Sequence, residues 1–320
     1  MKYSIFIFLL FHVTAFSTEY PNKEFNVIVP LERGGSTDRM ARAMQPFLEE
    51  EMTYKVNVVN RKGQGTLLGT IDFLKSPQDG YNLFASTLSP YILNTILINK
   101  APYNLDDFEI INLQWFDYEF IAVNQYSPYS TLEELIQGIK TAKEPIKVAM
   151  LYQSTGYLII KLLMKKLGIA KDKIKFVFFH GGKVAREALI DNSVDIIVIS
   201  AQGSEKYRKF LKPIVIIKEK RSKRWDAPTL NEALESTNIS LPIFHGSMRG
   251  FAVSKEFKRN YPSRYNYILK SLKKVLARKK VQLNLRRNSI GCSWLGPEKS
   301  NKLLKETMKL LKEYDYLYKD

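Results

Sequence analysis

The sequence predicts an α/β fold built from two mainly parallel sheets, each flanked by helices. Short apolar runs of strand length alternate with stretches whose apolar residues recur at helical spacing, an alternation that is typical of parallel sheets. The chain has 320 residues, more than one core usually supports, so we expect two domains. A late apolar run, residues 250–254, is placed to return the chain from the second domain to the first.

Residues 25–29 form the first predicted strand, which is apolar on both faces and therefore suits a sheet covered on both sides. Pro30 ends this strand, and Gly34 and Gly35 allow a tight turn after it. A helix is expected next, and its first turn carries three cap-type side chains, Ser36, Thr37 and Asp38. Because first-turn N–H groups have no partner within a helix, the junction predicts a site for a carboxylate or phosphate.

The remaining first-domain elements follow in βαβ order. Strands are expected at residues 55–60 and 80–86, with a helix through residues 71–76 between them. Ligand sites of parallel sheets lie beyond the carboxyl ends of the strands. Gly34 and the pair Ser86 and Thr87 occupy such ends, so we expect them to face a ligand.

The second domain begins with an apolar strand at residues 119–124 and a capped helix from residue 130. Further strands and helices are then expected at residues 147–151, 158–167, 175–179, 183–190, 195–200 and 214–217. After the returning strand, covering helices are expected at residues 262–280 and 297–314. This organisation divides the chain into residues 18–120 with 250–320 and residues 121–249.

Residues 1–17 are typical of a secretory signal peptide. One lysine precedes a short apolar run that ends in small residues, with cleavage expected after Ser17 and no cysteine there to take a lipid. The run is too short to span a bilayer, and no later segment approaches that length, so a soluble exported chain is expected. Cys292 is the only cysteine and is expected to be a buried structural thiol.

The charge balance is strongly basic, with 49 Lys and Arg against 32 Asp and Glu. Nucleic acid, an anionic membrane or a lysine-rich proteome could each account for it. The basic residues are scattered through helices with little aromatic interleaving, so no nucleic-acid partner is expected.

No catalytic constellation is visible. His180 and His245 are far apart and lack metal-ligand spacing, and no Gly-x-Ser-x-Gly elbow is present, so neither a metal nor another cofactor is expected. The glycines at 63, 65 and 69 imitate a dinucleotide fingerprint, but they follow the second strand and lack an acidic partner. A structural turn is favoured there over a dinucleotide-dependent enzyme.

Several segments, in order and spacing, resemble one family. They are Tyr20-Pro-Asn-Lys, Val29-Pro-x-x-x-Gly-Gly-Ser-Thr-Asp38, Val58-Val-Asn-Arg-x-Gly-x-Gly65, Ser76-Pro-Gln-Asp-Gly-Tyr81, Asn104-x-x-Asp-Phe108, residues 181–195, and Lys220-Arg-Ser-x-x-x-Asp-Ala-Pro-Thr-Leu-Asn-Glu-Ala233. The family is the substrate-binding receptors of tripartite tricarboxylate transporters, also called Bug proteins. The resemblance covers the chain from about residue 20 to its C-terminus.

The resemblance implies a two-lobed periplasmic binding protein, type II-like, whose lobes hinge shut on a ligand. By position in the family, the second binding loop is Gln153, Ser154, Thr155 and Gly156. The family's histidine position after this loop is apolar here, and Leu31-Glu32-Arg33 replaces the family's usual uncharged residues. Arg33 could therefore bind a carboxylate or remain solvated, and the same two readings apply to His245 and Arg249.

The implied function is a periplasmic, non-enzymatic receptor that passes a small carboxylate to the membrane subunits of a tripartite tricarboxylate-type transporter. A monomer is expected. A solute sensor that presents its closed form to a signalling protein is the alternative. The predicted ligand-binding residues are Arg33, Gly34, Gly35, Ser36, Thr37, Asp38, Ser86, Thr87, Gln153, Ser154, Thr155 and Gly156.

Overall fold

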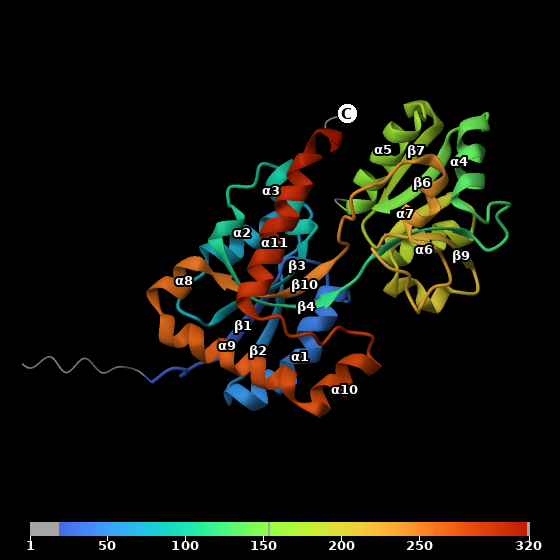
Figure 1. The fold of residues 1–320 in the computed structure, drawn as a ribbon. Helices are drawn as coiled ribbons and strands as arrows, with labels where there is room; N and C mark the ends of the chain where they lie inside the picture. Colours follow the sequence, from blue (N-terminus) through green and yellow to red (C-terminus); the bar gives the residue numbers. More distant parts are fainter. Residues whose placement is uncertain (1–18, 153, 319–320) are drawn as a thin grey trace, which may run out of the picture.

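The computed structural model describes residues 19–152 and 154–318, which form two five-stranded sheets flanked by helices (Figure 1). The first sheet has the order β2-β1-β3-β10-β4, with bounds β1 Phe25–Val29, β2 Val56–Asn60, β3 Asn82–Ser89, β4 Phe108–Phe116 and β10 Met248–Ser254. The second has the order β7-β6-β8-β5-β9, with bounds β5 Glu119–Asn124, β6 Ile146–Leu151, β7 Ile174–Phe179, β8 Ile196–Ser200 and β9 Leu211–Ile216. The predicted two-lobed α/β class is confirmed.

Helices cover both faces of each sheet. On the first sheet, one face packs against α1 (Ser36–Met52), α9 (Pro262–Ala277) and α10 (Lys279–Arg287). The other face packs against α2 (Leu67–Lys75), α3 (Tyr91–Ile98) and α11 (Gly296–Glu313). On the second sheet, α6 (Gly182–Ile190) covers one face, and α4 (Leu132–Thr141) and α5 (Thr155–Leu167) cover the other. The short helices α7 (Leu230–Ala233) and α8 (Lys255–Asn260) complete the α-helices described.

One strand in each sheet opposes the other four, and it is the strand that arrives from the other sheet. β10 is antiparallel to β3 and β4, and β5 is antiparallel to β8 and β9. The chain leaves the first sheet after Phe116 and enters the second at Glu119, and β10 returns it at Met248. The carboxyl ends of the other four strands therefore meet the two crossings, at what we call the junction.

The two crossing segments are bonded to each other. The Asp117 N–H donates to the Ser247 carbonyl at 2.9 Å, and the Trp115 indole N–H donates to Gln202 Oε1 beyond β8. We keep the division into residues 18–120 with 250–320 (lobe 1) and 121–249 (lobe 2) as a proposal.

Strand β4 and helix α3 are absent from the sequence-based expectations. β4 was missed because polar residues interrupt its apolar run, yet those residues are buried with partners. Glu109 pairs with Lys255 at 3.1 Å and Lys258 at 2.7 Å, and Asn112 Oδ1 accepts the N–H of Leu295 at 2.8 Å at the start of α11. The single helix expected at residues 262–280 is two helices, because Arg278 adopts an extended conformation between them.

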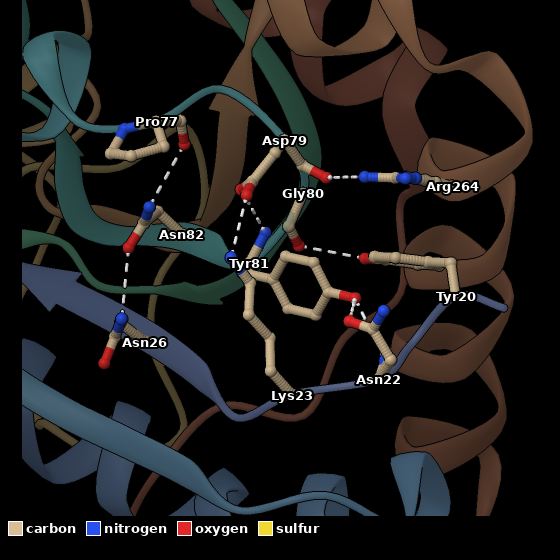
Figure 2. A network of polar contacts seen from close by, with 10 residues as sticks. All are labelled: Tyr20, Asn22, Lys23, Asn26, Pro77, Asp79, Gly80, Tyr81, Asn82 and Arg264. Carbon is tan, nitrogen blue, oxygen red and sulfur yellow. Dashed lines mark hydrogen bonds and ion pairs between the residues drawn. The ribbon is translucent and has the colours of Figure 1, made fainter. Parts of the chain in front are cut away.

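The N-terminal segment is held by a polar network that joins two of the motif segments (Figure 2). Tyr20 donates its hydroxyl proton to the Gly80 carbonyl at 2.9 Å, and Lys23 pairs with Asp79 at 3.0 Å. From α9, Arg264 Nη1 donates to the Asp79 carbonyl at 2.9 Å (Figure 2). These contacts give the segment and the turn before β3 a structural role away from the junction.

Two remaining expectations concern exposure and export. Cys292 is half-buried rather than buried, and it packs beside the core under α1 and α9. None of the helices in the described part of the chain is long and apolar enough to cross a membrane. The predicted signal peptide, residues 1–17, lies outside the described residues.

Candidate functional site

The turn between β1 and α1 is built by glycine and a buried carboxylate. Gly34 has a φ of +84°, a conformation that side chains disfavour, and its N–H donates to Asp38 Oδ2 at 2.8 Å. Arg42 pairs with the same carboxylate at 3.0 Å and reaches Asn60 Oδ1 at 2.9 Å. Burial opposes ionisation of Asp38, but the Gly34 N–H and Arg42 hold its pKa below the ordinary value. The Asp38 carboxylate is therefore occupied in shaping the turn.

The start of α1 meets the end of β3. Thr37 and Thr87 are buried, and their hydroxyl oxygens lie 2.8 Å apart. Gly35 is extended and offers no side chain to cap α1, so the first-turn N–H groups of the helix receive no capping bond from it. Three predicted residues, Ser36, Thr37 and Thr87, are thus brought together at the junction.

Arg249 joins this group from β10. It lies opposite Thr87 in the antiparallel pair, its Nε donates to Ser36 Oγ at 2.8 Å, and its guanidinium carbon is 4.6 Å from the centre of the Trp115 ring. The side chain is buried, and its Nη1 has no hydrogen-bond partner among the residues described. Burial lowers the pKa of Arg249, and the nearby Asp117 opposes that shift. The solvated-loop reading is wrong for Arg249, whereas His245 is exposed.

Ser86 and Arg33 do not join the hydroxyl group around Thr87. Ser86 is buried, but strand alternation places it on the sheet face opposite to Thr87, with Phe84 and Leu88. Arg33 is exposed at the tip of the β1–α1 turn. Its role in ligand binding stays a prediction.

The second sheet contributes the start of α5, which follows the carboxyl end of β6. Ser154 and Thr155 are buried, and neither hydroxyl makes a hydrogen bond of normal geometry in the described chain, although the Thr155 hydroxyl faces the Glu119 carboxylate. Gly156 lies so close to a carboxylate that a Cβ there would be 2.7 Å from Glu119 Oε2. Gln153 lies outside the described residues. The loop thus ends at a helix start that already faces an acid.

Glu119 begins β5 directly after the first crossing and is 3% exposed. Burial raises its pKa to about 8, the Thr155 hydroxyl and the first N–H groups of α5 oppose the rise, and Asp117 adds to it. Burial also raises the pKa of Asp117, although Arg249 and the N–H of Tyr118 oppose that shift. Asp117, Glu119 and the Arg249 guanidinium therefore share the junction, and the buried Arg186 also acts on Asp117.

Buried polar atoms without a partner gather at this junction. Within residues 19–152 and 154–318, five side chains at these strand and helix ends carry such an atom: Ser89, Glu119, Ser154, Thr155 and Arg249. Buried polar groups are normally hydrogen-bonded, so such a set calls for an explanation. A polar ligand between the sheets would supply the missing partners.

Sequence reasoning missed Glu119 and left Arg249 undecided. The signal for Glu119 was a charged residue at the first position of an apolar strand, next to the crossing between domains. Arg249 had the same signal at the start of the returning strand. A charge at the edge of a buried strand must find a partner, and at a strand end between domains that partner can be a ligand.

The arrangement suits recognition of an anion. A guanidinium with an unpartnered N–H can bond a carboxylate with a charge-assisted hydrogen bond, and hydroxyls beside it can donate a second. The starts of α1 and α5 each add partial positive charge at the strand ends of their own sheet.

Comparison with known proteins gives consistent matches. A model of the tripartite tricarboxylate transporter family receptor matches residues 40–246. Protein BugT of Bordetella pertussis is 29% identical over 238 residues, which are 70% of each chain. MatC of Rhodopseudomonas palustris, solved with bound malate, has a TM-score of 0.71 at 20% identity and covers 92% of this chain and 100% of its own. A second R. palustris protein, solved with adipate, has a TM-score of 0.74 at 18% identity over 93% of this chain and 98% of its own. At these identities the two structures establish the fold alone.

Proposed function

Since this chain belongs to the tripartite tricarboxylate transporter receptor family, we propose that it is a periplasmic receptor that captures a small carboxylated solute and delivers it to the membrane subunits of a tripartite transporter. It acts by binding and does no chemistry on the solute. The family assignment rests on a match that covers most of the chain.

The observation that carries the proposal is Arg249. Its guanidinium is buried at the junction, held by Ser36 on one side and by Trp115 on its face, and one of its nitrogens is unpartnered. A buried cation with a free N–H is stabilised when an anion meets it, and a carboxylate matches the planar guanidinium. The malate and adipate found in the two R. palustris proteins are carboxylates too.

We propose that predicted residues on both sheets also contact the solute. On the first sheet, the turn and strand end supply backbone N–H groups and hydroxyls, with Arg33 at the rim and Asp38 holding the turn. On the second, the start of α5 supplies Ser154, Thr155 and the adjoining N–H groups; the predicted Gln153 lies outside the described residues. A ligand that bonds groups on both sheets favours the arrangement in which the two lobes lie closer together.

The periplasmic location rests on the family and on the proposed signal peptide. We propose that the signal peptide is cleaved after Ser17. We propose that this mature chain is a monomer.

A thermal-shift screen tests the proposal. The mature chain, residues 18–320, is heated with mono-, di- and tricarboxylates, each paired with its amide as an uncharged control. A ligand that binds only the folded state stabilises it and so raises Tm. The stabilisation is about 2.7 kcal/mol when the free ligand concentration is a hundred times Kd. We expect at least one carboxylate, and not its amide, to raise Tm. If every carboxylate leaves Tm unchanged at millimolar concentration, the receptor proposal fails.

A further inference from the structure

The start of α5, where a second carboxylate of a ligand would be expected, already faces a carboxylate of the chain itself. Glu119 comes from β5, and its Oε2 lies where the Cβ of a side chain at Gly156 would have to be. Since the helix has 13 residues, its first N–H groups carry appreciable partial charge, and Glu119 is placed to receive it.

One oxygen of Glu119 also remains available to accept a hydrogen bond. Glu119 is 3% exposed, and the Thr155 hydroxyl and the first N–H groups of α5 face its carboxylate, but its Oε2 makes no hydrogen bond of normal geometry within the described chain. The other buried glutamate at a strand start, Glu109, contrasts with it, because two lysines and the Tyr265 hydroxyl at 3.2 Å fill its oxygens. A buried acceptor that the fold leaves unpartnered can be completed by a donor on a ligand.

Glu119 and Arg249 belong to one electrostatic neighbourhood. Burial raises the pKa of Tyr91, at the start of α3, to about 12, while Arg249 lowers it and Glu119 raises it. A solute lying between the sheets would therefore meet a cation on the first sheet and an acid on the second.

We propose that the receptor is built for a solute with a single carboxylate, which Arg249 binds, and with a hydroxyl or amine at its other end, which donates to Glu119. This inference rests on the proposed function and narrows its solute class. Where Glu119 is ionised, a dicarboxylate would bring a second negative charge against it, and the repulsion and the absent donor would both weaken binding of the dicarboxylate.

Matched pairs of solutes test the inference. Terminal hydroxy acids and dicarboxylic acids of equal chain length, 4-hydroxybutyrate with succinate and 5-hydroxypentanoate with glutarate, are titrated into the mature protein by calorimetry at pH 9, where Glu119 is ionised. We expect the hydroxy acid of at least one pair to bind roughly tenfold or more tightly than its dicarboxylate. At pH 6, where Glu119 is protonated, the preference should shrink. Other titratable groups that interact with Glu119 are Asp117 before β5, Tyr91 on α3 and Tyr318 after α11.

Glu119→Gln keeps the size of the side chain and removes its charge, so it should reduce the preference for the hydroxy acid over the dicarboxylate at pH 9. If the glutamine variant fails to fold, Glu119→Ala should reduce the same preference. Glu109→Gln, the control at an equally buried acid, should leave the preference unchanged. Equal or tighter binding of the dicarboxylates by the wild type at pH 9, or a preference that survives both Glu119 variants, would overturn the inference while leaving the receptor function intact. If no carboxylate of either series or of the thermal screen binds, it is the receptor function that fails.

Discussion

The substitution Arg249→Lys tests the proposed carboxylate site most sharply. It keeps a positive charge near Asp117 but removes the planar fork, the bond to Ser36 and the unpartnered Nη1. A hydrogen bond to a charged group contributes about 1.5 to 3 kcal/mol, so Kd for the carboxylate should rise by about tenfold to 150-fold. Lysine is preferred to an apolar residue because it keeps a positive charge beside the buried Asp117, on which Arg186 also acts.

The same substitution at Arg33 is the matched control. Arg33 is exposed, and lysine and arginine differ little in water, so Arg33→Lys should change Kd by about twofold or less. Isothermal titration with the tightest carboxylate from the thermal screen gives both values, and circular dichroism confirms that each variant is folded. If Arg249→Lys binds like the wild type while Arg33→Lys loses tenfold or more, the solute is held at the tip of the turn and our placement of the site is wrong.

Three further predictions concern stability and motion. Glu119→Gln should leave the free energy of unfolding nearly unchanged at pH 5 and raise it by up to roughly 4 kcal/mol at pH 9. The reason is that the pKa of Glu119 is raised to about 8, so the wild type loses stability as pH rises through that value. Equal urea midpoints for wild type and variant at pH 9 would contradict this. Asp38→Asn should lower the free energy of unfolding by about 2 kcal/mol at pH 7, because it weakens the hydrogen bond from Gly34 and removes the ion pair with Arg42. This loss of stability should shrink as pH falls through the lowered pKa of Asp38. A loss that stays constant from pH 7 to pH 2 would argue against the prediction. Tyr157→Ala on α5 should enlarge the radius of gyration of the ligand-free protein. The substitution removes the stacking of Tyr157 on Tyr318 (ring centroids 5.6 Å apart), which joins the chain after α11 to the second sheet and contributes about 1 kcal/mol. An unchanged scattering profile would show that this stacking does not restrain the lobes.

The elements that the sequence predicted share one property, an apolar pattern of uniform period. β5, for example, occupies the predicted residues 119–124, and the β1–α1 turn falls where glycine and cap-type residues predicted it. β4 escaped prediction because its buried polar residues are paired with side chains and backbone more than 140 residues away, such as Lys255 and Leu295. No local pattern reveals such partners.

The candidate site likewise contains some residues that the sequence could predict and others that it could not. Ser36, Thr37 and Thr87 could be predicted because each follows a strand or begins a helix, and the carboxyl ends of parallel strands meet at one edge. Arg249 and Glu119 could not be placed, because both stand on the strands that cross between sheets. Their burial depends on how the two sheets face each other, which periodicity along one strand does not encode. A side chain that is charged, buried and incompletely bonded becomes visible only in three dimensions.

The central claim is that the two lobes close on a carboxylate held between them. Small-angle X-ray scattering of the mature protein, measured without ligand and with the tightest carboxylate from the thermal screen at saturation, tests it directly. The account predicts a smaller radius of gyration with the carboxylate and no change with its amide. A radius of gyration that stays the same while calorimetry shows the carboxylate fully bound would contradict the claim.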